Sequence, residues 1–370
     1  MHRKGSKMKK VLGVSDKEKH IYDIVYEKDF QGLQESCKEF ALANRKICII
    51  SDSNVAGYYL EEVKEMLSKV AHFVTSFVFP AGEASKTIDT VQKAYEHLIL
   101  NQFDRNDMLV ALGGGVVGDL TGFTAATYLR GIRFIQIPTS LLAMVDSSVG
   151  GKTGVDFLKY KNMVGAFYQP KLVYMNISVL RTLTEEHYYN GFAEIVKYGM
   201  IQDASFITWI QEHMQKIREH DEETLQEIVY QSCMFKRDIV QRDATEKGER
   251  ALLNYGHTLG HSIEKDSDFT LLHGQCVALG MVAALRINVQ RENVSQEELS
   301  QFETLLKELN LPTRIQEITI DEIIAGTKND KKMEAGKIKF ILLESIGKGY
   351  IDNTVTDEEM KQALSYLMKD

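Results

Sequence analysis

Cysteine and proline are both scarce in this chain of 370 residues, which contains only four of each. Cys37, Cys48, Cys233 and Cys276 are scattered without C-x-x-C spacing, which argues against a disulfide framework and against a cysteine-rich zinc site. The sequence also lacks a signal peptide and any apolar run long enough to span a membrane. We therefore expect a cytoplasmic protein.

Basic residues are outnumbered as well. The chain has 44 lysines and arginines against 52 aspartates and glutamates, which gives a net charge of −8. A nucleic-acid partner needs a basic surface, so this balance argues against one, and nothing indicates a membrane partner. Any anionic substrate must then be bound by local lysines and arginines. The content of 44% hydrophobic and 26% charged residues is that of an ordinary globular protein.

The length exceeds what one hydrophobic core usually supports, so we expect two domains. Residues 1–10 are basic and aperiodic and are predicted to be a disordered leader or tag. Strands and helices alternate over residues 11–182, which predicts an α/β domain with a Rossmann-like, doubly wound parallel sheet. Residues 183–370 are predicted to be mainly α-helical, with a single late strand at Ile338–Leu343.

A glycine turn lies between the predicted strand Met108–Leu112 and the predicted helix Asp119–Arg130. Gly113, Gly115 and Gly118 have the spacing of a dinucleotide-binding turn, in which backbone N–H groups and a helix N-terminus approach a pyrophosphate. The same spacing also suits a tight βα turn with no ligand. The acidic ribose partner usually found about 20 residues further on is missing.

Polar groups follow three other predicted strands. Thr139–Gly154, after the strand Phe134–Pro138, combines hydroxyls, glycines and Lys152 and suits an anion, but Asp146 replaces the first glycine of a P-loop. Asp52, after the strand Lys46–Ile50, is either a ribose ligand or a helix N-cap. The segment Glu83–Lys86 on its own is predicted to be a solvated loop.

Several polar residues of the helical half have helical spacing. Glu194 and Lys197 lie three apart, and a surface ion pair is the favoured interpretation. Arg250, Asn254, His257 and His261 are spaced four, three and four, which predicts one face of a single helix.

Two histidines on such a face indicate a metal site. His257 and His261, at i and i+4, can ligate one ion, and His273 adds a third imidazole. The spacing leaves the ligand set open between the His257–His261 pair and a more distributed site.

Long motifs of this sequence resemble the 3-dehydroquinate synthase family. They are Gly113–Phe123, Tyr128–Gly131, Pro138–Leu142, Val145–Gly154, Lys161–Asn162, Gly256–His261 and Leu272–Gly274. The resemblance implies the two-domain, dehydroquinate synthase-like fold, with an NAD-binding α/β domain and a metal-binding helical domain. It also implies that Glu194, His257 and His273 bind Zn²⁺ or Co²⁺.

The resemblance further assigns residues to NAD and to substrate. The implied NAD contacts are Asp52, Asn54, Glu83, Lys86, Gly114, Gly115, Val116, Asp119, Thr139, Ser140, Lys152, Lys161 and Thr182. The implied catalytic and substrate-binding residues are Lys152, Lys197, Lys236, Arg250, Asn254, His261, Asn162, Arg130 and Asp146, with one of Lys331 and Lys332. Arg130 is expected to reach the site of a neighbouring subunit, which implies a homodimer.

The implied activity converts 3-deoxy-D-arabino-heptulosonate 7-phosphate to 3-dehydroquinate and phosphate, a step of the shikimate pathway. Two alternatives are another sugar-phosphate cyclase and a metal-dependent polyol or glycerol dehydrogenase. The first usually departs from the pattern at Gly150–Gly154, which is intact here, and the second has no use for a phosphate-binding lysine.

Overall fold

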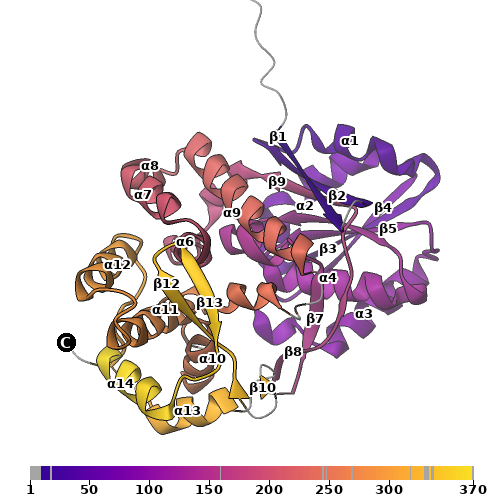
Figure 1. The fold of residues 1–370 in the computed structure, drawn as a ribbon. Coiled ribbons are helices and arrows are strands. Elements are labelled where there is room, and N and C mark those ends of the chain that lie inside the picture. Colours follow the sequence, from indigo (N-terminus) through magenta and orange to yellow (C-terminus); the bar gives the residue numbers. More distant parts are fainter. Residues whose placement is uncertain are drawn as a thin grey trace, which may run out of the picture. The chain divides into compact units, whose positions relative to one another are not determined.

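The computed structural model describes residues 10–16, 19–158, 160–243, 246, 248–267, 270–316, 318–328, 333–334 and 337–368. The chain divides into two compact units (Figure 1). Unit 1 contains the chain up to Thr182 together with Leu225–Arg237, and unit 2 contains Leu183–Thr224 and Asp238–Asp370. Helix α9 (Glu222–Arg242) therefore contributes its middle to unit 1 and its ends to unit 2. Of the leader predicted over residues 1–10, only Lys10 is described, and it begins the first strand.

Unit 1 is built on a seven-stranded sheet with the order β1-β2-β9-β6-β5-β3-β4. The strands are β1 (Lys10–Asp16), β2 (Lys19–Glu27), β9 (Leu172–Asn176), β6 (Arg133–Pro138), β5 (Met108–Gly113), β3 (Lys46–Asp52) and β4 (Phe73–Phe79). Neighbours are parallel from β2 to β4, and only β1 pairs antiparallel, with β2. The predicted parallel sheet is confirmed, with one antiparallel strand added at its edge.

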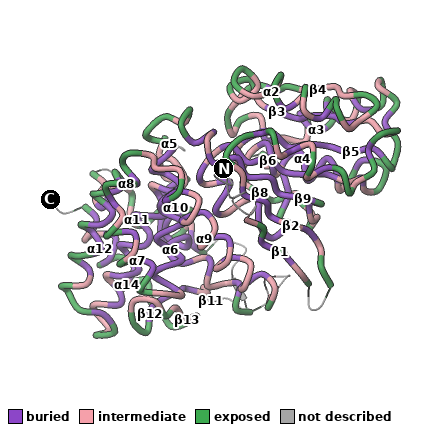
Figure 2. Tube along the Cα trace, turned by 90° about the horizontal axis from the view of Figure 1, so that it is seen from above, coloured by how far each residue is buried: buried purple, intermediate pink, exposed green. Residues whose placement is uncertain are grey.

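The central strands read as continuous apolar runs because both of their faces are covered. All six residues of β5 are buried, as Figure 2 shows along the traces of β3, β5 and β6. Helices α1 (Leu33–Ser36), α2 (Ser53–Ser68), α3 (Ile88–Leu100) and α4 (Gly115–Thr127) belong to this unit. Leu120 of α4 and Phe134 of β6 are fully buried in one core cluster, where each contributes roughly 1.5–3 kcal/mol.

The polar segment after β6 contains regular secondary structure. Ala143–Ser147 forms a short π-helix, and β7 (Lys152–Phe157) pairs antiparallel with β8 (Tyr160–Phe167). Gly122 lets this hairpin pack on α4, since a Cβ there would lie 2.3 Å from Thr153 Cγ2. The hairpin thereby holds its residues against the helix that follows the glycine turn.

Unit 2 is mainly helical, as predicted. Its helices are α5 (Glu185–Asn190), α6 (Phe192–Gln202), α7 (Ala204–Glu212), α8 (Met214–Arg218), α10 (His257–Asp266), α11 (His273–Gln290), α12 (Gln296–Glu308), α13 (Ile320–Lys328) and α14 (Asp357–Leu367). The prediction of a single late strand was wrong. β10 (Met333–Glu334) pairs with β11 (Lys337–Ile338), and β12 (Phe340–Ser345) pairs with β13 (Lys348–Asp352).

Helix α11 is the centre of unit 2, because it is buried on nearly every side and packs against α6, α10, α12 and α14. Its Asn288 donates a hydrogen bond to the carbonyl of Leu343 and accepts one from the same residue's N–H, which fixes β12 on the helix. Within the part of the chain that is described, no helix has both the length and the apolar character needed to cross a bilayer.

Candidate functional site

Helix α6 places Glu194 and Lys197 in the interior of unit 2, so the interpretation of a surface ion pair was wrong. The side chains are 0% and 1% exposed, and the Lys197 Nζ is ion-paired with Glu194 Oε2. Every residue from Phe192 to Ile201 is buried. Placing two charges in such a helix costs folding free energy unless a partner or a ligand compensates both.

The expectation that Arg250, Asn254, His257 and His261 share one helix was also wrong. Arg250 and Asn254 lie on a 3-10 helix, Glu249–Asn254, while α10 begins at His257. Gly256 separates the two with a φ of 78°, and a Cβ there would lie 2.8 Å from the carbonyl oxygen of Val277 on α11. The close approach of α11 therefore requires a glycine, and its left-handed backbone breaks the helix just before His257.

The first residues of α10 and α11 converge on Glu194. His257 Nε2 lies 3.2 Å, and His273 Nε2 3.5 Å, from Glu194 Oε1. The imidazoles of His257, His261 and His273 also form a group whose ligand nitrogens lie within 4.8 Å of one another. The structure thus brings together both ligand sets that were considered. The His257–His261 pair and the implied set of Glu194, His257 and His273 share His257, and His273 lies close to both.

The electrostatics of this group suit a divalent cation. Burial alone would raise the pKa of Glu194, but the Lys197 ammonium and the His257 imidazole outweigh it, so the pKa lies well below its usual range. Burial lowers the pKa of His257 despite the Glu194 carboxylate, which favours a neutral imidazole. Burial acts the same way on His273, yet the carboxylates of Glu194 and Glu264, each 3.5 Å from one of its ring nitrogens, raise its pKa to about 9.

The hydrogen bonding of the Glu194 carboxylate shows whether these residues fit a metal. Neither oxygen of its buried carboxylate accepts a hydrogen bond of normal geometry from a described residue, although Oε2 has its ion pair with Lys197. Buried carboxylate oxygens are normally satisfied, and catalytic zinc sites commonly use three ligands from histidine and glutamate. The donor set therefore fits Zn²⁺ or Co²⁺.

Glu264 was missed by the sequence analysis. It is 5% exposed on α10, and its Oε2 lies 3.5 Å from His273 Nδ1. The signal was present, because Glu264 follows His261 by three residues and continues the polar face of α10.

The other predicted residues of unit 2 lie on the same two segments. Arg250 is 1% exposed, and its backbone N–H donates to Asp243. The Asn254 amide donates to Glu246 over 3.2 Å, and His261 is exposed. Lys331 and Lys332 lie outside the described residues.

Lys86 in unit 1 is not part of a solvated loop, contrary to expectation. It is 4% exposed, and its Nζ donates to Asp119 Oδ2 over 2.8 Å and to Asn162 Oδ1 over 2.6 Å. Lys161 Nζ lies 3.9 Å from Glu83 Oε1, and burial raises the pKa of Glu83 despite the two lysines beside it. The structure thus connects Asn162 with a network of four predicted NAD contacts, which are Glu83, Lys86, Asp119 and Lys161.

The glycine turn opens α4 four residues earlier than predicted, at Gly115. Its N-cap residue, Gly114, has no side chain with which to cap the first N–H groups of the helix. Hydroxyl groups surround this end: a Cβ on Gly115 would lie 3.2 Å from Ser147 Oγ, and one on Gly114 would lie 3.4 Å from Ser140 Oγ. Uncapped N–H groups at a helix N-terminus suit a pyrophosphate.

Asp52 ends β3 and caps α2, where its Oδ1 accepts from the N–H groups of Asn54 and Val55 over 2.8 and 2.9 Å. The N-cap interpretation is confirmed, and a ribose contact through the other oxygen stays a prediction. The Thr182 hydroxyl lies 2.5 Å from that of Tyr59 on α2. The buried Thr139 directs its N–H to the carbonyl of Gly113.

Among the predicted substrate contacts of unit 1, Lys236 Nζ donates to both the carbonyl and the carboxylate of Asp146, over 2.8 and 2.6 Å. Lys152 is exposed at the start of β7. Arg130 is exposed too, with a φ of 66° between Leu129 and Gly131, whose φ values are also positive.

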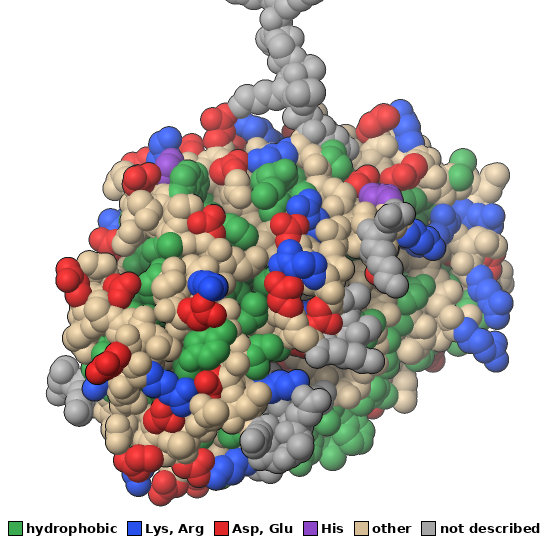
Figure 3. Space-filling view, viewed as in Figure 1, with side chains coloured by type: hydrophobic (Ala, Val, Ile, Leu, Met, Phe, Trp, Pro, Cys, Tyr) green, Lys and Arg blue, Asp and Glu red, His purple; other side chains and the backbone are tan. Residues whose placement is uncertain are grey.

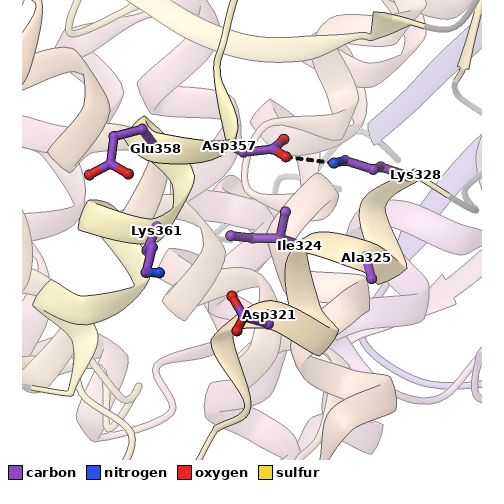
Figure 4. A pocket seen from close by; sticks show the side chains of 7 residues that line it. All are labelled: Asp321, Ile324, Ala325, Lys328, Asp357, Glu358 and Lys361. Atoms are coloured by element: carbon purple, nitrogen blue, oxygen red, sulfur yellow. Dashed lines mark hydrogen bonds and ion pairs between the residues drawn. The ribbon is translucent and has the colours of Figure 1, made fainter.

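A further pocket in unit 2 lies between α13 and α14, and Figure 4 shows its side chains. Asp321, Asp357, Glu358, Lys328 and Lys361 line it, and Lys328 is ion-paired with Asp357. None of the predicted site residues that the structure describes lines it. Figure 3 shows acidic and basic groups interspersed over the face in view.

Comparison with known proteins gives matches over most of the chain. The family model described as 3-dehydroquinate synthase N-terminal matches residues 76–190, and the one described as 3-dehydroquinate synthase C-terminal matches residues 191–333. The chain is 44% identical over 339 residues to the 3-dehydroquinate synthase of Acetivibrio thermocellus, covering 92% of this chain and 94% of that protein. It is 43% identical over 324 residues to that of Rippkaea orientalis, covering 86% and 88%.

Solved structures are similar as well. The 2-epi-5-epi-valiolone synthase of Streptomyces hygroscopicus subsp. jinggangensis, with NAD⁺ and Zn²⁺ bound, matches with a TM-score of 0.86 at 27% identity, covering 94% of this chain and 96% of that chain. A 2-deoxy-scyllo-inosose synthase complexed with carbaglucose-6-phosphate, NAD⁺ and Co²⁺ matches with the same TM-score of 0.86 at 24% identity, covering 96% and 99%. At that identity the second match supports the fold alone.

Proposed function

This chain belongs to the 3-dehydroquinate synthase family and is an enzyme, and we propose that it converts 3-deoxy-D-arabino-heptulosonate 7-phosphate to 3-dehydroquinate and phosphate. It is then a carbon–oxygen lyase that eliminates phosphate and closes a carbocycle. Relatives of this name cover about nine-tenths of the chain at 44% and 43% identity. The observation that carries the proposal is the buried Glu194 carboxylate on which His257 and His273 converge.

We assign a divalent metal, Zn²⁺ or Co²⁺, to Glu194, His257 and His273. When bound there, the ion supplies Lewis-acid polarisation of the substrate oxygen at the carbon that is oxidised and then reduced. Lys197 balances the charge of the glutamate and is assigned to a substrate hydroxyl. His261, on the same helix as His257, is assigned to substrate.

We assign NAD to unit 1, where it would supply reversible hydride transfer to and from the substrate, so that no nicotinamide would be consumed overall. The uncapped N-terminus of α4 suits the pyrophosphate, with Gly114, Gly115 and Val116 as contacts. The network of Lys86, Asp119, Glu83 and Lys161 supplies polar contacts for the rest of the cofactor. Asp52, Asn54, Thr139, Ser140 and Thr182 complete the proposed set.

The chain's own cations are assigned to the two anionic groups of the substrate. Arg250 supplies a guanidinium that can hold the carboxylate with two hydrogen bonds, and Asn254 supplies an amide beside it. The exposed Lys152 supplies an ammonium for the phosphate. Lys236 is held by Asp146, which fixes its position before substrate arrives.

Proton transfer requires a base at the carbon next to the oxidised one, and the departing phosphate itself can serve. The side-chain oxygen of Asn162 accepts a hydrogen bond from Lys86 Nζ, and its backbone N–H donates to the carboxylate of Asp156 over 2.8 Å, so both its side chain and its backbone are held in place. We also propose a homodimer in which Arg130 contributes to the site of the partner subunit.

The reaction product distinguishes the proposed activity from the two alternatives. Purified protein incubated with the heptulosonate phosphate and a small amount of NAD is expected to give 3-dehydroquinate, identified by NMR, and one phosphate per turnover. A ring product that keeps its phosphate would assign the chain to another type of sugar-phosphate cyclase. Net NADH formation from glycerol, with no phosphate released, would assign it to the dehydrogenases.

A further inference from the structure

The two histidines proposed as metal ligands each direct their outer ring nitrogen toward an oxygen. His257 Nδ1 lies 3.0 Å from the backbone carbonyl of Tyr255, and His273 Nδ1 lies 3.5 Å from Glu264 Oε2. The inner nitrogens of both rings face Glu194 Oε1. We propose that Glu264 is a positioning residue, whose carboxylate orients His273 so that Nε2 is presented to the metal; this rests on the proposed ligand set.

The fold holds Glu264 and His273 in fixed relation, because they lie on neighbouring helices that pack closely. Glu264 is on α10 and His273 begins α11. At their contact, a Cβ on Gly260 would lie 2.8 Å from the carbonyl oxygen of Cys276, so the two backbones approach as near as a glycine allows. A carboxylate on so closely packed a helix has little freedom to leave the imidazole.

Burial gives the contact its strength. The Glu264 side chain is 6% exposed and that of His273 31% exposed, so water competes weakly for the carboxylate. A carboxylate that accepts the Nδ1–H of an imidazole fixes the tautomer, leaves the Nε2 lone pair for the metal, and makes that nitrogen a better ligand.

The two ligands differ in what holds them, which makes the proposal testable. His257 is oriented by a main-chain carbonyl that no side-chain substitution removes. His273 is oriented by a side chain that can be changed while every proposed ligand stays in place. Glu264→Gln keeps the size of the residue and removes its charge.

The test is the zinc affinity of the full chain, measured by competition of metal-free protein with a chromophoric chelator of known affinity. Glu264→Gln is expected to bind zinc about 10–100-fold more weakly than the unaltered protein. The matched control is Glu303→Gln, which removes another buried carboxylate of unit 2, one that is ion-paired with Arg314. It is expected to keep the original affinity. Equal affinities of Glu264→Gln and the unaltered protein would overturn the proposal.

The visible absorption spectrum of the Co²⁺-loaded protein is a second readout that does not depend on activity. At saturating Co²⁺, the visible absorption of Glu264→Gln is expected to differ from that of the unaltered protein, whereas Glu303→Gln leaves it unchanged. If Glu264→Gln does not fold, Glu264→Asp, which keeps the charge but shortens its reach, is expected to show a smaller loss of affinity; an unchanged affinity and spectrum would overturn the proposal. Absence of zinc binding by the unaltered protein would instead refute the proposed metal site itself.

Discussion

The buried ion pair of Glu194 and Lys197 makes a prediction about folding that needs no substrate. Glu194→Gln leaves the Lys197 ammonium, which is 1% exposed, facing a neutral amide. Breaking one side of a buried pair typically costs about 3–5 kcal/mol of unfolding free energy, because a charge is left without its counter-charge. We expect a loss of that size in metal-free protein. Lys197→Met should cost less, about 2–3 kcal/mol, because Glu194 still faces two imidazoles.

The double variant Glu194→Gln with Lys197→Met removes both charges together. Replacing a whole buried pair by neutral side chains is often close to neutral, so the double variant should lose less than about 2 kcal/mol. The two losses are therefore strongly non-additive, which is the signature of direct coupling between contacting residues.

The chain supplies its own reporter, because its single tryptophan is Trp209 on α7 of unit 2. Urea unfolding followed by Trp209 fluorescence, in the presence of a chelator, gives the stability of that unit. An unfolding free energy of Glu194→Gln within about 0.5 kcal/mol of that of the unaltered protein, or two losses that simply add, would show that the two buried charges are not coupled.

Three further predictions concern ligands and pH. His273→Ala should lower bound zinc below one per chain by elemental analysis, and His261→Ala should spare it; metal loss in the second variant would favour the His257–His261 pair instead. Lys152→Ala should weaken binding of the phosphorylated substrate about 10–100-fold in calorimetry and leave NAD binding nearly unchanged, whereas equal losses would indicate a cofactor contact. Hydrogen bonds from Arg291 hold the pKa of Glu359 at about 2, below the usual 4.5. That pair therefore stabilises the fold above about pH 4.5 and loses its effect as pH falls toward 2. Glu359→Gln should cost about 1 kcal/mol at pH 7, because solvent screens this partly exposed pair, and almost nothing at pH 2; a pH-independent loss would contradict this.

The strands of the sheet were predictable because parallel strands covered on both faces are continuous apolar runs. Met108–Leu112 and Phe134–Pro138 were each found to within one residue of β5 and β6. The helical character of unit 2 was equally readable from its periodicity. The β7–β8 hairpin was not, because its strands mix glycines and charged residues with exposed apolar side chains such as Met163 and Phe167, and β7 packs on α4.

The break before His257 could not be read from spacing alone. The intervals from Arg250 to His261 fit a helix, and a glycine inside such a pattern is usually tolerated. The break arises from contact with α11, more than 20 residues later in the chain, which forces Gly256 into a left-handed conformation.

Burial of charge was likewise invisible in the sequence. Lys86 looked solvated because its partners, Asp119 and Asn162, lie 33 and 76 residues away. Glu194 looked like half of a surface pair because its histidine neighbours are on two other helices. Motif resemblance assigned these residues to NAD, metal and substrate, and those roles stay predictions.

The measurement that tests the account most directly is phosphate release from 3-deoxy-D-arabino-heptulosonate 7-phosphate with NAD far below the substrate concentration. We predict many phosphates released per NAD, no accumulation of NADH, loss of the activity after removal of metal by a chelator, and its return when Zn²⁺ or Co²⁺ is added. Phosphate release that stays constant in chelated, verifiably metal-free protein would contradict the account.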